Sequence, residues 1–145
     1  AAKLDGLLNF IPARLSGVLL ALAALFTPTA SPVKALTVMI RDAKNHSSPN
    51  AGWPEGAVAG ALGFALAGPR RYGGTMVEDE WIGDGRARLK PADISRTLYL
   101  YVVACLLQVM GIASLLTARL TYGWQWSQWL DDLVRFFQSL PGMFG

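Results

Sequence analysis

The polar middle of the chain contains one carboxylate and one imidazole at helical spacing. Asp42 and His46 are four residues apart, so they share a face if this segment is helical. Together they could pair with each other or coordinate a cation, because an imidazole titrates near neutrality and binds metals. Such a pair is more often a structural hydrogen bond, and the spacing leaves both interpretations open.

Glu55 follows a loop rich in residues that break helices. In this loop Asn50 and Gly52 can adopt turn or left-handed conformations, and Pro49 and Pro54 fix φ. Glu55 then falls in the first turn of the next expected helix, where the helix dipole favours a carboxylate. It can be a capping carboxylate, a ligand for Mg²⁺ or a substrate ammonium, or both.

A second candidate surface is an arginine pair flanked by glycines in GPRRYGG, residues 68–74. Backbone N–H groups and the guanidinium groups of Arg70 and Arg71 can meet a phosphate there, beside Tyr72. The run matches no standard phosphate-loop signature.

Further along, carboxylate and basic residues alternate again. Asp84, Arg86, Arg88 and Lys90 suit Mg²⁺ with phosphate, and they suit a solvated surface equally well.

Composition limits what kind of protein carries these groups. The chain has 145 residues, of which 52% are hydrophobic and 16% charged, and its mean hydropathy is +0.33. Soluble domains average about 25% charged residues, so the composition indicates that lipid replaces water over part of the surface. The net charge of +3 is small and dispersed, which argues against nucleic-acid binding. The single Cys105 cannot form an internal disulfide.

Two apolar stretches predict membrane helices. Leu98–Ala118 has 21 residues without a formal charge, the length that about 30 Å of hydrocarbon requires. Leu15–Phe26 has only 12, and it reaches spanning length only if Leu7–Ala13 is included. A signal peptide is the competing interpretation of this first stretch. Because the chain opens without Met, we expect the interior of a longer protein or a processed product.

Two further segments complete the expected fold. The small side chains of Gly56–Pro69 predict a half-spanning or buried helix, with Gly56 and Gly60 spaced for close helix packing. Tyr122–Leu140 is amphipathic and begins with tryptophans at 124, 126 and 129, which indicates an interfacial helix or, alternatively, packing against a partner helix.

The expected fold class is therefore mainly α. We expect an integral membrane protein with two membrane helices, a small-residue half-spanning or buried helix, polar loops and a C-terminal amphipathic interfacial helix. Residues 1–121 would form the membrane domain, and residues 122–145 the tryptophan-rich tail.

The block RDAKNHSSPNAGWPEGAVAGALGFALAGPRRYGG closely resembles the central signature of the CobD/CbiB family, the adenosylcobinamide-phosphate synthases of cobalamin biosynthesis. The stretches LDGLLNFIPARLSGVLLAL, WIGDGR and PADISRTLYLY are also similar to the family, so the resemblance covers about Leu4 to Thr121. The signature positions are filled by Arg41, Asp42, His46, Ser48, Pro49, Asn50, Gly52, Trp53, Gly68, Tyr72 and Gly73. Family members are longer, and the N-terminal half is the part without a counterpart here.

The resemblance implies a membrane enzyme, in the bacterial inner membrane, that joins adenosylcobyric acid to an aminopropanol phosphate by an ATP-dependent amide bond. It implies ATP and Mg²⁺ as cofactors, a corrinoid substrate, membrane lipid around the chain, and a complementary N-terminal half or other membrane subunits as partners. The alternative is a truncated relative that serves as a structural accessory subunit of a larger complex.

Residue chemistry assigns roles within that reaction. Arg and Mg²⁺ stabilise the charge that develops on a transferring phosphoryl group, and an imidazole near neutrality can deprotonate an ammonium. The expected catalytic residues are His46, Asp42 and Glu55, the expected substrate and phosphate contacts are Arg41, Asn50, Arg70, Arg71, Tyr72 and Arg86, and the expected metal ligands are Asp42, Glu55 and Asp84.

Overall fold

The computed structural model describes residue 6 and residues 8–138, without the side chains of Tyr72, residues 124–127 and Phe137. The chain is mainly helical, as predicted. The helical elements are α2 (Phe10–Ala23), η1 (Ala24–Phe26), α3 (Pro32–Asp42), η2 (Ala43–Asn45), α4 (Gly52–Leu62) and α5 (Pro91–Gln138). The strands are β1 (Leu66–Ala67), β2 (Arg70–Tyr72), β3 (Thr75–Val77) and β4 (Trp81–Ile82).

Helix α3 begins and α4 ends at sequence signals of the expected kind. The Ser31 hydroxyl accepts a hydrogen bond from the backbone N–H of Lys34, and Pro32 occupies the first turn. Helix α4 ends where Gly63 adopts a left-handed conformation with φ of 70°. The predicted helix over Gly56–Pro69 is therefore wrong beyond Leu62, because Gly63 turns the chain out of the helix.

Two short antiparallel sheets follow α4, and the sequence analysis did not predict them. Strands β1 and β4 pair with Leu66 opposite Ile82, and β2 and β3 pair with Arg70 opposite Val77. Between β2 and β3, Gly73 and Gly74 both have positive φ, the conformation that a tight hairpin turn requires.

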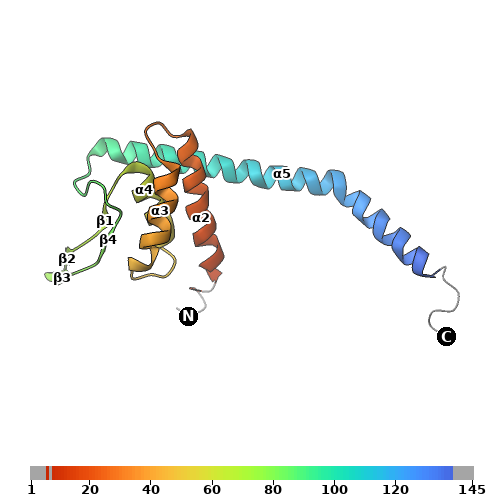
Figure 1. The fold of residues 1–145 in the computed structure, drawn as a ribbon, viewed down its shortest axis with the longest axis horizontal. Coiled ribbons are helices and arrows are strands. Elements are labelled where there is room, and N and C mark those ends of the chain that lie inside the picture. The colour runs from red at the N-terminus through yellow and green to blue at the C-terminus, as the bar shows by residue number, and fades with distance from the viewer. Residues whose placement is uncertain (1–5, 7, 139–145) are drawn as a thin grey trace. The chain divides into compact units, whose positions relative to one another are not determined.

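Helices α2, α3 and α4 lie side by side (Figure 1). The predicted glycine spacing on α4 is confirmed and extends over Gly52, Gly56 and Gly60. A Cβ atom at these positions would lie 2.9, 2.8 and 2.9 Å from the Cα atoms of Ala43, Met39 and Ala35 respectively. Because only hydrogen fits in that space, the backbone of α4 runs in direct contact with those of α3 and η2 along about two helical turns.

The core joins these helices to the start of α5. Leu20 of α2, Leu62 of α4 and Phe64 are buried with Leu100 and Ala104 of α5. Two compact units divide within α5, between Leu107 and Gln108, and the core belongs to the first.

One helix of the described residues is long and apolar enough to cross a membrane, Pro91–Phe136, and an 18-residue window within it has a mean hydropathy of 2.1. It contains the predicted span Leu98–Ala118. The other predicted membrane helix is a shorter apolar helix, Phe10–Phe26, because a 3₁₀ turn and the extended Thr27 end it.

The tail is part of α5. We expected a separate helix over Tyr122–Leu140, but α5 continues through Tyr122 to Gln138, since Arg119–Gly123 contains no proline to stop it. Trp129 and Leu133, which lie within the expected amphipathic segment, are exposed. The side chains of Trp124 and Trp126 near its start, together with Leu140 at its end, lie outside the described residues.

Candidate functional site

A network of charged side chains joins the end of α3 to the loop after β4. Arg41 donates hydrogen bonds from Nε and Nη2 to its neighbour Asp42, and from Nη1 to Oδ2 of Asp84 at 2.7 Å. Asp42 is buried and also accepts a hydrogen bond from the backbone N–H of Gly83 at 2.8 Å. Residues more than forty positions apart in sequence thus meet at one guanidinium group.

The charges in this network reinforce one another. Hydrogen bonds from the Arg41 guanidinium, followed by that from the Gly83 N–H, hold the pKa of Asp42 below its ordinary value, against the opposing effect of burial. The same contacts with Asp42 and Asp84 raise the pKa of Arg41 above its ordinary value. Asp42 is therefore ionised at neutral pH and Arg41 is a permanent cation.

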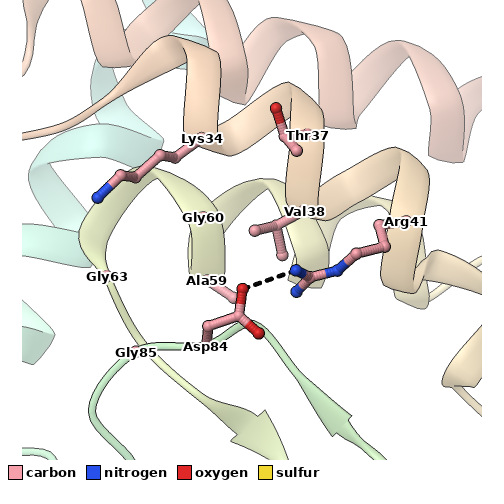
Figure 2. A pocket seen from close by; sticks show the side chains of 9 residues that line it. All are labelled: Lys34, Thr37, Val38, Arg41, Ala59, Gly60, Gly63, Asp84 and Gly85. Carbon is pink, nitrogen blue, oxygen red and sulfur yellow. Dashed lines mark hydrogen bonds and ion pairs between the residues drawn. The ribbon is translucent and has the colours of Figure 1, made fainter.

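Next to this network lies a cavity of about 230 Å³ between α3, α4 and the loop after β4 (Figure 2). Its lining residues are Lys34, Thr37, Val38, Arg41, Ala59, Gly60, Gly63, Asp84 and Gly85. The glycine and alanine positions of α4 leave room for it, and α3 supplies the longer polar side chains. We call it the charged cavity.

Lys34 and Thr37 of the charged cavity were not identified from the sequence. Lys34, Thr37 and Arg41 follow the spacing i, i+3 and i+7, which places them on one face of a helix. Examining α3 as a helical face, with Lys34 two turns before Arg41, would have found both.

His46 pairs with Glu55 and not with Asp42. Its Nε2 lies 3.4 Å from Oε1 of Glu55, and its Nδ1 accepts a hydrogen bond from the backbone N–H of Ser48 at 2.8 Å. The expected shared face with Asp42 is wrong, because α3 ends at Asp42 and His46 is already extended. Since Nδ1 accepts, a neutral His46 carries its proton on Nε2, the nitrogen that lies near the Glu55 carboxylate.

The His46–Glu55 pair belongs to the same face of α4 as the charged cavity. Glu55 is in the first turn of α4, four residues before Ala59, which lines the cavity. One turn of helix rises about 5.4 Å, so the pair is one turn away from the cavity along α4.

Asn50 has a different role in the structure. Its Oδ1 accepts a hydrogen bond from Nη1 of Arg14 at 3.3 Å, and its Nδ2 donates to the carbonyl of Gly6 at 3.0 Å. The Arg14 guanidinium also lies 4.5 Å from the centre of the Trp53 ring. Asn50 therefore fastens the start of α4 to α2, apart from the charged cavity.

The remaining predicted phosphate contacts do not line the charged cavity. Arg70 lies on β2 and forms an ion pair with Asp79 at 2.9 Å, and Arg71 is exposed on the same strand as Tyr72. Arg86 donates to Oδ1 of Asp93 at 2.8 Å. The sequence analysis did not single out Asp93.

Asp93 fixes the start of α5. It is buried, and its Oδ2 accepts a hydrogen bond from the backbone N–H of Lys90 at 2.7 Å. An acidic residue at the third position of a helix commonly reaches back in this way, and the proline at Pro91 is the accompanying signal.

The predicted metal ligands are not gathered into one site. The described residues include no group of three His, Cys, Asp or Glu side chains that could hold a metal ion. Asp42 is engaged by Arg41 and Gly83, and Glu55 faces His46. Asp84 is the exposed carboxylate at the charged cavity, and it fits the single protein contact that a phosphate-bound Mg²⁺ often has.

Fold and site define a class: a mainly helical protein with one helix long enough to span a membrane and a charged cavity beside a histidine–carboxylate pair. The family model described as "CobD/Cbib protein" matches residues 1–101. The chain belongs to the CobD/CbiB family.

Its relatives carry names from cobalamin biosynthesis. The chain is 44% identical over 118 residues to cobalamin biosynthesis protein CobD of Rhodobacter capsulatus, covering 80% of this chain and 36% of the relative. It is 52% identical over 103 residues to CobD of Brucella suis, covering 70% and 32%. It is 45% identical over 119 residues to cobalamin biosynthesis protein CbiB of Salmonella typhimurium, covering 82% and 36%.

The chain thus spans about a third of the length of the curated relatives it matches. No solved structure matches it. The names of these relatives support cobalamin biosynthesis, and they do not favour the alternative of a structural accessory subunit.

Proposed function

We propose that the chain takes part, at a membrane, in the reaction of adenosylcobinamide-phosphate synthases. In that reaction an ATP-dependent amide bond joins adenosylcobyric acid to an aminopropanol phosphate. The observation that carries the proposal is the charged cavity, which Arg41 and Lys34 of α3 line together with the exposed Asp84, in a chain of this family.

The cavity offers donors for a phosphate group. Arg41 has five N–H groups, and its contacts with Asp42 and Asp84 use three of them. Lys34 contributes a second cation two helical turns away. These groups would bind a substrate phosphate or stabilise the charge on a transferring phosphoryl group.

Amide formation also requires a proton acceptor. In the proposed reaction, a carboxylate oxygen attacks the γ-phosphorus of ATP and ADP leaves. The amine nitrogen then attacks the activated carbonyl carbon and displaces inorganic phosphate. The incoming ammonium must first lose a proton, and we assign that step to the His46–Glu55 pair. Glu55 is the more exposed member, and His46, held by Ser48, orients it.

Magnesium would neutralise charge on the phosphates, and Asp84 is the residue positioned to contact it. Asp42 serves this site by holding Arg41, and we assign it no contact with the metal.

The test is gentle detergent extraction of the chain from its native membranes, with mass spectrometry of the proteins that co-purify. The same sample is assayed with ATP, Mg²⁺, adenosylcobyric acid and aminopropanol phosphate. Amide product that depends on ATP, together with a complementary family segment in the sample, supports the proposal. Absence of product from a sample that contains such a segment contradicts it.

A further inference from the structure

A second cavity, of about 280 Å³, lies between α4, β1 and the first turns of α5. It shares no lining residue with the charged cavity. Six of its eight lining side chains are apolar, and the full set is Val58, Phe64, Leu66, Leu89, Asp93, Ile94, Thr97 and Leu98. We call it the apolar cavity. Ile94 and Leu98, which line it from α5, are more than half exposed. The cavity therefore opens onto an exposed apolar surface, which is unfavourable in water.

One end of the apolar cavity is polar and carries excess positive charge. Asp93, which lines it, forms ion pairs with Arg86 at 2.8 Å and with Arg96 at 3.5 Å. Two cations therefore share a single carboxylate. Arg88 and Lys90, the exposed neighbours of the lining residue Leu89, add two more cations in the same loop. This end attracts an anion.

The sequence puts this cavity at the start of the candidate membrane span. Leu98 lines the cavity and is also the first residue of the 21-residue uncharged stretch within α5. Basic residues next to a membrane span contact anionic lipid headgroups. A ligand that joins an anionic group to an apolar chain fits both ends of this cavity.

We propose that the apolar cavity binds one acyl chain of an anionic phospholipid, with the lipid phosphate held at the Arg86–Arg96 end. Burial of Ile94, Leu98 and Leu89 by the acyl chain removes apolar surface from water. The single charge of Asp93 cannot neutralise both Arg86 and Arg96, and the lipid phosphate supplies the second negative charge. This site goes beyond the proposed synthase reaction and does not depend on it.

The experiment uses the full chain purified in mild detergent and incubated with palmitoyl-oleoyl phosphatidylglycerol or with the matching phosphatidylcholine. Native mass spectrometry then counts the lipids retained on the protein. We expect one strongly retained phosphatidylglycerol, bound about tenfold more tightly than phosphatidylcholine, because the choline cation offsets the charge of the same phosphate and is repelled by the arginines. Equal retention of the two lipids would overturn the headgroup assignment.

Variants locate the lipid. Val58→Phe fills the cavity from α4, and Ile94→Ser removes an exposed apolar wall without touching the buried core. Val102→Phe enlarges an exposed side chain outside the cavity and is the matched control. We expect both cavity variants to weaken phosphatidylglycerol retention about tenfold and the control to leave it unchanged.

Arg96→Gln separates the two ends of the site. We expect it to weaken retention of phosphatidylglycerol more than that of phosphatidylcholine, because the choline cation already offsets part of the attraction between Arg96 and the phosphate. If Ile94→Ser, verified as folded by circular dichroism, retains phosphatidylglycerol as the unmodified chain does, the cavity is not the lipid site. None of these readouts uses synthase activity, so the proposed function can fail while this site stands.

Discussion

The guanidinium group of Arg41 bonds to Asp84 through Nη1 at 2.7 Å, across 43 positions of sequence. Because the same group also holds Asp42, one side chain connects the end of α3 with the loop after β4. Arg41 and Asp84 both line the charged cavity, so this contact joins its α3 side to the loop that carries Asp84 (Figure 2).

Asp42 should stabilise the fold at neutral pH. Because its pKa in the folded protein is below the ordinary value of 3.8, the unfolded chain binds more protons than the folded one around and below that pH. The stabilising contribution is therefore present above pH about 4 and is lost as the pH falls through the folded pKa. Asp42→Asn should lower the free energy of unfolding at pH 7 by about 1–3 kcal/mol and flatten its dependence on acid.

Chemical denaturation of the detergent-solubilised chain between pH 3 and 7 measures both effects. Asp131→Asn, at an exposed position of α5, is the control and should change neither. If Asp42→Asn leaves the free energy of unfolding at pH 7 unchanged, the contacts of Asp42 make no net contribution to stability.

Lys34 should act on substrate binding. Lys34→Gln keeps a polar, unbranched side chain that is one atom shorter, and it removes the second cation of the charged cavity. Loss of one charge contact to a phosphate raises KM for aminopropanol phosphate about tenfold with little change in kcat. Lys44→Gln, at an exposed lysine outside the cavity, is the matched control. Equal KM values for both variants would remove Lys34 from the substrate site.

The His46–Glu55 pair should act on the rate. His46→Ala and Glu55→Gln should each lower kcat roughly 10²–10⁴-fold, the range for a lost general base, and the double variant should lose little more, because the pair acts as a unit. Ser47→Ala, exposed beside His46, is the control. Unchanged kcat in a folded His46→Ala variant would exclude the pair from proton transfer.

Alanine substitution should change the stability in opposite directions at a glycine of α4 and at a glycine of α5. A Cβ at Gly56 would lie 2.8 Å from the Met39 Cα, whereas a Cβ at Gly111 of α5 meets nothing within 4 Å. Gly56→Ala should therefore destabilise the chain by about 1–3 kcal/mol, and Gly111→Ala should be neutral or stabilise by up to about 1 kcal/mol. Thermal unfolding in detergent measures both. A Gly56→Ala variant as stable as the parent would contradict the close approach of α3 and α4.

The candidate membrane span within α5 can be tested by adding a charge to it. Val109 is exposed near the middle of the uncharged stretch of α5. A charge there costs about 2.5–3.5 kcal/mol of insertion free energy, so Val109→Arg should reduce the fraction of chain that stays in the membrane pellet after alkaline extraction. Val109→Leu should keep that fraction unchanged. Equal pelleting of both variants would argue against a span at this position.

Local patterns in the sequence predicted the parts of the fold that depend on local physics. The uncharged run from Leu98 gave a long apolar helix, and the Gly56–Gly60 spacing gave close helix packing, because each depends only on residues within a few turns. The ends of elements were harder to predict. In the sequence, Gly63 is one of several small residues in a row, and nothing local distinguishes it from Gly56 or Gly60. Its left-handed conformation depends on the path of the chain from α4 into β1.

The sequence analysis selected candidate residues one by one and did not predict which of them contact one another. Arg41, Asp42 and Asp84 were all selected, but Asp84 comes near α3 only because the loop after β4 folds back on it. His46 was matched with Asp42 by counting helical positions, and the end of α3 redirected it to Glu55. Contacts across more than forty residues depend on tertiary packing, which no local window contains.

The glycines at 52, 56 and 60 have a consequence for protein engineering. Along these positions α4 presents main chain to α3, so the fit depends on the path of both backbones and cannot be restored by repacking side chains. A chimaera that takes α4 from one relative and α3 from another must reproduce both paths at once. The two helices therefore form a single exchangeable module, to be grafted together with the turn that joins them.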